Sequence, residues 1–110
     1  DLAQQHGVSM ALHMAGTPIS TLASVHCAAA TENFIALEHH FTDVPFWADF
    51  VEGLPKPLIQ DGTIAVPETP GLGFTLNEEV MREHLLPEDP NLFAPTPQWD
   101  SERSWDRLWS

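Results

Sequence analysis

Two short apolar segments flank one helical segment near the start of the chain, and this order limits the folds that the sequence can adopt. Residues 8–12 alternate larger and smaller side chains as a short strand does, and residues 34–37 form an apolar run typical of a strand buried on both faces. Thr17 and Pro18 are a typical helix start, and we expect a helix from Pro18 to Thr31. Strand, helix and strand in this order predict a βαβ unit with two parallel strands.

Within the expected helix, small and apolar side chains recur at intervals of three and four residues. This spacing predicts one face that packs closely against a sheet, formed by Ile19, Leu22, Ala23, His26 and Ala30. Cys27 lies in the same alanine-rich run, where a buried and unreactive thiol is the ordinary interpretation. As the single cysteine of the chain, Cys27 can form neither an internal disulfide nor a CxxC zinc motif.

The stretch after residue 40 changes character, because aromatic, proline and acidic residues replace the short apolar runs. We expect a loop and hairpin excursion over residues 41–70. Trp47 and Phe50 indicate a short helical turn within it. Asp61-Gly62 is a strong signal for a two-residue hairpin turn between short strands.

A second helix is expected after this excursion. Thr75-Leu76-Asn77-Glu78 has the pattern of a capping box, and Pro87 would end the helix. Its apolar stripe is predicted to be Leu76, Val80 and Leu85. We therefore divide the chain into residues 1–86, which hold the βα units and their excursion, and a Pro- and Trp-rich tail at residues 87–110 that contains Trp99, Trp105 and Trp109.

The chain is strongly acidic, and this limits its partners. Four basic residues against sixteen acidic ones give a formal net charge of −12. Such a charge repels a phosphate backbone, so we expect no nucleic-acid partner. Proline, glycine or charge interrupts every apolar stretch before the roughly 18 residues that a membrane helix needs. The start of the chain also lacks the features of a signal peptide. We therefore expect a soluble, cytoplasmic protein with no membrane partner.

Polar, titratable residues follow both predicted strands. His13 ends the first strand, and Glu38, His39 and His40 end the second. Because the carboxyl ends of parallel strands meet at one edge of a sheet, where α/β proteins bind ligands, these residues are candidates for a site. Solvated loop residues are the alternative interpretation. A parallel pair with a single crossover helix leaves both sheet edges open and is not expected to be stable alone, which indicates a larger sheet.

Four segments carry a family resemblance: LHMAGTP around His13, SVHCAAATENF at the end of the helix, IALE in the second strand, and PGLG before the last helix. In this order they resemble the last two βα units of the mandelate racemase/muconate lactonizing enzyme branch of the enolase superfamily, especially its galactonate dehydratase-like members. The resemblance covers about residues 7–86. It implies that the chain is the C-terminal part of a (β/α)8 TIM-type barrel, that the intact enzyme is a homo-oligomer, and that the isolated fragment is inactive.

The resemblance also implies a reaction and roles for the residues at the strand ends. A sugar-acid dehydratase of this kind, a lyase, abstracts the proton α to a carboxylate and eliminates the β-hydroxyl to give a 2-keto-3-deoxy acid. His13 would be a general acid/base, and Glu38 would lie beside the carboxylate of the small-molecule sugar acid. His39 and His40 would line the sugar pocket.

The resemblance further implies a Mg²⁺ cofactor that stabilises the enediolate, with its ligands upstream of this chain. No metal ligand is therefore expected among these residues, and the loop acids Asp43, Asp49, Glu52, Asp61 and Glu68 are interpreted as solvated. Two other functions remain open. One is a racemase or epimerase of the same superfamily, and the other is a non-enzymatic acidic interaction module whose aromatic residues contact a partner.

Overall fold

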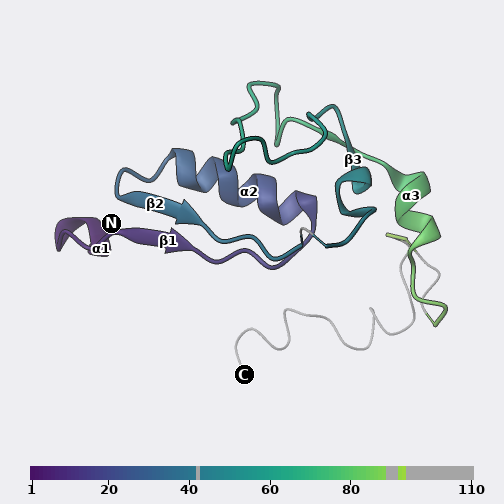
Figure 1. The fold of residues 1–110 in the computed structure, drawn as a ribbon, viewed down its shortest axis with the longest axis horizontal. Helices are drawn as coiled ribbons and strands as arrows, with labels where there is room; N and C mark the ends of the chain where they lie inside the picture. Colours follow the sequence, from purple (N-terminus) through teal and green to yellow (C-terminus); the bar gives the residue numbers. More distant parts are fainter. Residues whose placement is uncertain (42, 89–91, 94–110) are drawn as a thin grey trace. The chain divides into compact units, whose positions relative to one another are not determined.

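The computed structural model describes residues 1–41, 43–88 and 92–93, and the chain divides into two units, Asp1–Asn77 and Glu78–Ser110 (Figure 1). The predicted tryptophan tail therefore lies outside the described residues, apart from its first few positions. The first unit opens with a short helix, α1 (Leu2–Gln5), which precedes the first strand. No helix in the described ranges is long and apolar enough to cross a membrane.

The predicted βαβ unit is confirmed. Strand β1 (Met10–Leu12), helix α2 (Pro18–Ala29) and strand β2 (Phe34–Leu37) follow one another, and β1 pairs with β2 in parallel (Figure 1). The ladder aligns Leu12 with Leu37, and an irregularity between Met10 and Ala11 leaves Ile35 without an aligned residue in β1. The two strands therefore end together, which brings the residues that follow them to one place.

Strand β1 and helix α2 each differ from the prediction at one end, and a side-chain hydrogen bond accounts for each difference. Strand β1 begins two residues later than predicted, because the carbonyl of Val8 accepts a 2.6 Å hydrogen bond from the Asn33 side chain instead of a ladder bond. Helix α2 ends at Ala29 rather than at Thr31. The Thr31 hydroxyl donates a 2.7 Å hydrogen bond to the Cys27 carbonyl, and this bond satisfies one of the carbonyls that a helix end leaves free.

The predicted inner face of α2 is partly wrong. Leu22 is fully buried, but Ala23, Cys27 and Ala30 are exposed, so Cys27 is not the buried thiol that we expected. The buried residues of α2 are Pro18, Thr21, Leu22 and Val25. Alanines lie on several sides of this helix, so its apolar periodicity indicates a helix without fixing which stripe packs inward.

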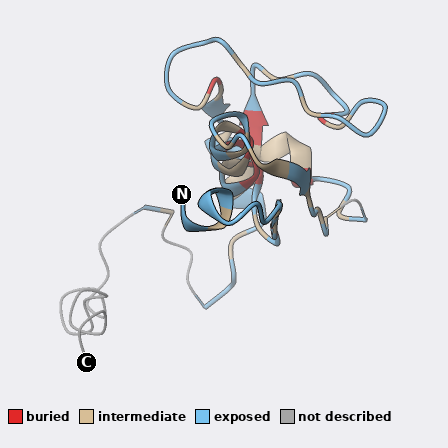
Figure 2. Ribbon diagram, turned by 90° about the vertical axis from the view of Figure 1, so that its left-hand side faces the viewer, coloured by how far each residue is buried: buried red, intermediate tan, exposed pale blue. Residues whose placement is uncertain are grey.

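The core that buries α2 comes from segments on both sides of it in the sequence. Met14, Trp47 and Leu58 are buried against Leu22 and Val25. The Trp47 indole N–H donates a 2.8 Å hydrogen bond to the Gly16 carbonyl, so the excursion is tied to the loop that follows β1. Much of the remaining described chain is exposed or half-buried (Figure 2).

The excursion contains the predicted turns but also a strand pairing that we did not predict. A 3-10 helix, η1 (Trp47–Phe50), supplies the helical turn. Asp61 and Gly62 both have positive φ, and Gln60 and Thr63 exchange two 2.9 Å backbone hydrogen bonds across them, which confirms the hairpin turn. The strands expected to flank this turn are reduced to that single bridge.

The prediction that Thr75-Leu76-Asn77-Glu78 caps the start of a helix is wrong. Strand β3 (Val51–Glu52) pairs antiparallel with strand β4 (Thr75–Leu76), so Thr75 is extended and helix α3 (Glu78–Glu83) begins three residues later. The described side chains of α3 are not buried, and Leu76 is exposed, so the predicted apolar stripe is also not buried. An ion pair between Arg82 and Glu78 at 2.8 Å joins successive turns of this short helix.

The PGLG segment has a backbone that requires glycine. Gly73 has a φ of +87°, and a β-carbon at this position would lie 2.2 Å from the β-carbon of Pro67. Gly71 also has a positive φ of +76°, but no atom lies within 4 Å of the place its β-carbon would take. Two constraints therefore act at Gly73, backbone conformation and close packing, and only the first acts at Gly71.

Candidate functional site

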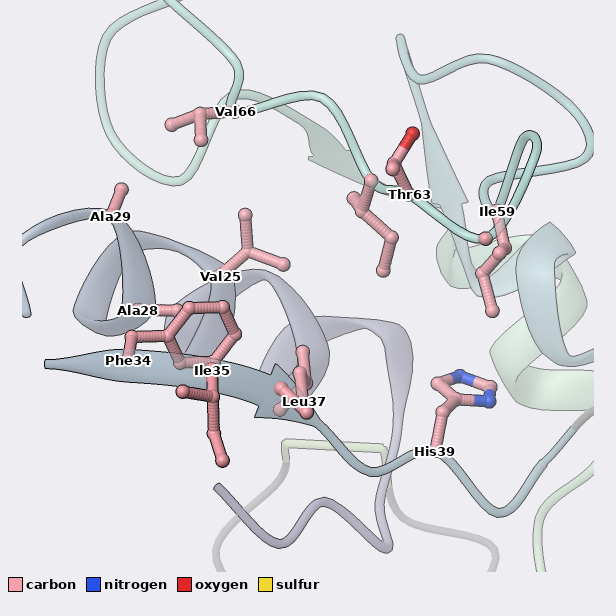
Figure 3. Close-up of a pocket in the computed structure, with 13 residues that line it drawn as sticks. Val25, Ala28, Ala29, Phe34, Ile35, Leu37, His39, Ile59, Thr63 and Val66 are labelled. Atoms are coloured by element: carbon pink, nitrogen blue, oxygen red, sulfur yellow. The ribbon is translucent and has the colours of Figure 1, made fainter. Parts of the chain in front are cut away.

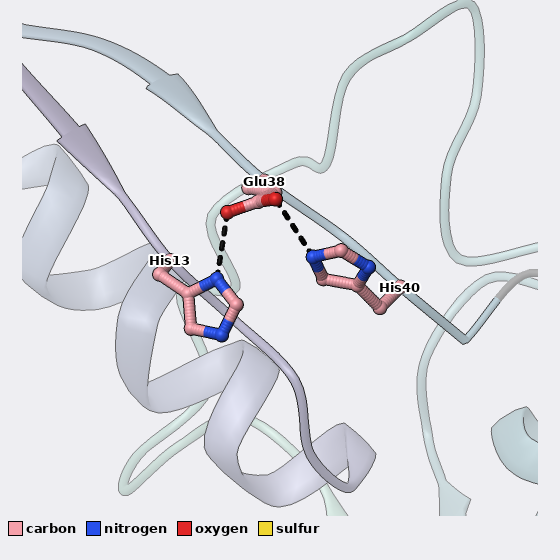
Figure 4. A group of neighbouring side chains, drawn as sticks. All are labelled: His13, Glu38 and His40. Atoms are coloured by element: carbon pink, nitrogen blue, oxygen red, sulfur yellow. Dashed lines mark hydrogen bonds and ion pairs between the residues drawn. The ribbon is translucent and has the colours of Figure 1, made fainter.

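The side chains of His13 and Glu38 meet beyond the ends of β1 and β2. The backbone N–H of Glu38 donates a 2.8 Å hydrogen bond to the Leu12 carbonyl, which continues the parallel ladder to the residue after β2. This bond places Glu38 beside His13, and His13 Nδ1 lies 2.6 Å from Glu38 Oε2 (Figure 4). The two side chains are therefore well within the distance of about 10 Å that a shared strand-end edge predicts.

His40 completes a cluster of three side chains around the same carboxylate. Its Nε2 lies 2.7 Å from Glu38 Oε1, so the two carboxylate oxygens each have one imidazole partner (Figure 4). The ring centroids of His13 and His40 are 5.3 Å apart. We call His13, Glu38 and His40 the His-Glu-His cluster.

The cluster is open to solvent, and its charges are coupled through hydrogen bonds. Each of the three side chains is about half exposed or more. The hydrogen bond from His13, and then that from His40, holds the pKa of Glu38 below its ordinary value of 4.5. Glu38 therefore carries a negative charge at neutral pH, between two rings that can donate or accept a proton.

His39 lies on the other side of the chain from the cluster, as alternation along an extended segment requires. Its ring meets Trp47 edge-on, with centroids 4.8 Å apart, and both of its ring nitrogens are buried without a hydrogen-bond partner among the described residues. Burial, and then the charge of His40, lowers the pKa of His39 from its ordinary value of 6.5. The structure thus separates His39 from His40, although we grouped them as pocket residues.

His39 borders a cavity of about 490 Å³ between α2, β2 and residues 59–66 (Figure 3). The lining is mainly apolar and includes Val25, Phe34, Leu37, Ile64 and Val66. None of the cluster residues is part of the lining that the structure describes. The cavity lies between α2, β2 and residues 59–66 and not at the strand ends where His13 and Glu38 meet, so we place the candidate site at the His-Glu-His cluster.

Replacing His39 by Phe is expected to make the stability of the intact protein less sensitive to acid. The folded state lowers the pKa of His39, so below about pH 6.5 the unfolded state binds more protons and the fold loses stability, whereas above that pH no loss occurs. Phe keeps an aromatic ring beside Trp47 but cannot be protonated. Thermal unfolding at about pH 7.5 and about pH 5.5 measures the difference. His6→Phe is the control, and an equal acid sensitivity in both variants would contradict the prediction.

Two residues outside the cluster hold the site in place. Asn33, the residue before β2, donates a side-chain hydrogen bond to the Val8 carbonyl and so fixes the start of β2 against the segment before β1. Thr21, which the sequence did not single out, is fully buried, and its hydroxyl lies 3.1 Å from the Met14 sulfur. That contact fixes the residue directly after His13. Thr21 was not part of the inner face predicted for α2, so no signal in the sequence pointed to this contact.

The described residues do not form a Mg²⁺ site. The His-Glu-His cluster offers one ligand atom per residue, all within 4.8 Å of one another, and it is the one such group that the described residues provide. Two of its three ligand atoms are imidazole nitrogens, whereas Mg²⁺ takes oxygen ligands in octahedral geometry. Among the loop acids that we interpreted as solvated, Asp49 is about half exposed and forms an ion pair with Lys56.

Comparison with known proteins gives concordant results. A family model described as "Enolase C-terminal domain-like" matches residues 1–80. The chain is 41% identical over 93 residues to a D-xylonate dehydratase of Haloferax volcanii. This match covers 84% of this chain and 22% of that protein. The chain is also 27% identical over 104 residues to a D-gluconate dehydratase of Thermoproteus tenax. This second match covers 94% of this chain and 21% of that protein.

A solved structure agrees with these sequence relatives. The fold matches the crystal structure of a mandelate racemase/muconate lactonizing enzyme-like protein from Rubrobacter xylanophilus with a TM-score of 0.73 and 39% identity. The match covers 86% of this chain and 23% of that chain. The chain thus spans between a fifth and a quarter of the length of the relatives that it matches.

Proposed function

Because this chain belongs to the Enolase C-terminal domain-like family and folds as the C-terminal part of an α/β barrel, we propose that it forms the last two βα units of a sugar-acid dehydratase. The observation that carries the proposal is the contact between His13 and Glu38 at the ends of two parallel strands. Active sites of (β/α)8 barrels lie at this edge, where a substrate can touch residues from several strands. Relatives named as D-xylonate and D-gluconate dehydratases support the reaction class.

The proposed reaction removes water from a 2,3-dihydroxy acid. A base takes the proton α to the carboxylate, the C–O bond at the β-carbon breaks, and the leaving hydroxyl receives a proton and departs as water. The resulting enol becomes a 2-keto-3-deoxy acid. Each step moves a proton at neutral pH, which a histidine can do because its ordinary pKa lies near 6.5.

We assign His13 the proton transfer. Its Nδ1 faces Glu38, so its Nε2 is the atom that can exchange a proton with a bound substrate. Glu38 fixes the orientation of that ring. The two histidines lower the pKa of Glu38 in the free site, but a substrate carboxylate beside it would raise that pKa by like-charge repulsion, so that the two carboxyl groups share a proton. His40 contacts the other Glu38 oxygen and would meet the sugar hydroxyls from the same side.

The family is associated with a divalent metal, and we propose Mg²⁺ as the cofactor of the intact enzyme. When bound, it would supply positive charge beside the enediolate that forms as the α-proton leaves. Since the described residues do not fit Mg²⁺, its ligands would come from other strands of the barrel. The residues of this chain would bind the substrate and move protons.

A product assay on the intact enzyme tests the proposal. The enzyme is incubated with Mg²⁺ and a panel of aldonic and aldaric acids that includes D-xylonate and D-gluconate, and 2-keto acid is measured. We expect at least one acid to be converted. Loss of stereochemical purity at the α-carbon without any keto acid would indicate a racemase or epimerase instead, and no reaction with any acid would contradict both enzymatic readings.

A further inference from the structure

We propose that Trp47 positions His13 and Glu38 for proton transfer by holding together the two segments that follow β1 and β2. Its indole N–H donates a 2.8 Å hydrogen bond to the carbonyl of Gly16, in the segment that begins with His13. Its ring meets that of His39, the residue after Glu38, with centroids 4.8 Å apart and planes at 87°. One side chain therefore contacts both segments. The proposal rests on the proposed function, because it concerns the proton transfer assigned to His13.

Backbone pairing alone does not fix the distance between these two segments. The hydrogen bond from the Glu38 N–H to the Leu12 carbonyl continues the ladder, but within the described part of the chain no backbone hydrogen bond joins residues 13–16 to residues 39–41. The contact between His13 and Glu38 cannot fix it alone, because its strength changes whenever one of the two gains or loses a proton. A preorganised site therefore needs supporting contacts outside the reacting pair.

Trp47 is itself fixed by the core of the first unit. Its side chain is buried with Met14 and Leu22, and only 7% of the residue is exposed. Its backbone N–H donates a 3.2 Å hydrogen bond to the Val44 carbonyl at the start of η1. Further barrel strands added to this conformation can only bury these groups more, so the two contacts of Trp47 do not depend on a surface that the rest of the enzyme covers.

The support reaches the segment after β2 from the side opposite the substrate. His39 lies beyond the end of β2 and points away from Glu38 and His40, so Trp47 contacts this segment on its core side (Figure 3). Trp47 thus acts through Gly16 and His39 and needs no contact with the sugar acid. A displacement of about 1 Å in a reacting group can lower turnover by about 10²-fold, so a smaller movement after loss of the indole N–H should still be measurable.

Trp47→Phe in the intact enzyme tests the proposal, because Phe keeps an aromatic ring beside His39 but has no N–H for the Gly16 carbonyl. We expect kcat per folded active site to fall about tenfold, with KM little changed. In an enzyme that already carries His13→Asn, the same substitution should lower kcat by less than about twofold, because the group that Trp47 positions is gone. A purely structural role would give the same fold loss in both backgrounds.

Two further variants control for folding. Val51 is buried but lies outside the core cluster that holds Trp47, so Val51→Ala should keep the wild-type kcat per folded site. Replacing Trp47 by β-(3-benzothienyl)alanine keeps two fused rings and puts sulfur in place of the N–H, so it removes the hydrogen bond with little change in packing. This enzyme should also lose about tenfold in kcat. Wild-type kcat here, or equal fold losses with and without His13, would overturn the proposal.

Crystal structures of the intact wild type and Trp47→Phe give a readout that needs no turnover. The distance between His13 Nδ1 and Glu38 Oε2, 2.6 Å in this structure, should exceed about 3.5 Å in the variant, beyond hydrogen-bond range. An unchanged distance would contradict the positioning role, whether or not the enzyme is a dehydratase. Failure of the wild type to convert any sugar acid would contradict the proposed function and leave this distance as the measure of what Trp47 does.

Discussion

Replacing His13 by Asn in the intact enzyme is expected to lower kcat for sugar-acid dehydration by about 10² to 10⁴. Asn is smaller and polar, so the contact with Glu38 can be kept in part, but its amide cannot take up and return a proton. Ground-state binding of the sugar acid depends on many groups, so KM should change little. Steady-state assays of 2-keto acid release, at saturating Mg²⁺ and several substrate concentrations, separate the two parameters.

Glu38→Gln is the matched comparison. Gln has the shape of Glu and can still donate a hydrogen bond to an enediolate oxygen, so kcat should fall by less than in His13→Asn. His6→Asn removes an exposed histidine away from the strand ends and should have the wild-type kcat. Wild-type turnover in His13→Asn would show that this histidine transfers no proton, and the proposed mechanism would then be wrong.

The βαβ unit could be predicted from the sequence because its signals are local. The apolar run at 34–37, the Thr17-Pro18 helix start and the alternation at 8–12 each depend on residues next to one another. The structure has these elements within two residues of the expected bounds. The parallel pairing followed from connectivity, since a crossover helix joins strands that run the same way.

The errors concern interactions between residues far apart in the sequence. Thr75 could either cap a helix or pair with Glu52 in a strand, and the structure has the strand pairing. No residue near Thr75 in the sequence indicates that Glu52 is its partner. The inner stripe of α2 depends on Met14 and Trp47, which lie outside the helix. Cys27 is exposed for the same reason, because it lies off the stripe that those residues cover.

The candidate site was predictable in its position more than in its composition. Parallel strands that end together bring His13 and Glu38 to one edge, and the structure places them there. Alternation along the segment after β2 could have separated His39 from His40, because adjacent side chains of an extended chain point in opposite directions. The pairing of His39 with Trp47 could not have been foreseen, since it depends on how the excursion folds back.

The second large effect concerns the isolated chain of 110 residues, which is expected to show no cooperative unfolding transition. The buried hydrophobic side chains of the described residues are few: Met14, Leu22, Val25, Trp47, Val51 and Leu58. Ile35, in the middle of β2, is 66% exposed, and Val8, just before β1, is 54% exposed. A two-stranded sheet with exposed apolar residues and open edges buries too little surface to offset the entropy of ordering the chain.

Thermal unfolding followed by circular dichroism measures this directly. A gradual, noncooperative change is expected for the isolated chain, and a sharp transition is expected once the remaining barrel strands are present in the intact enzyme. Those strands would pair with the open edges of β1 and β2 and cover Ile35, so hydrogen bonds and apolar burial are gained together. A sharp sigmoidal melt with dispersed amide NMR signals from the isolated chain would show that residues 1–77 already hold a sufficient core.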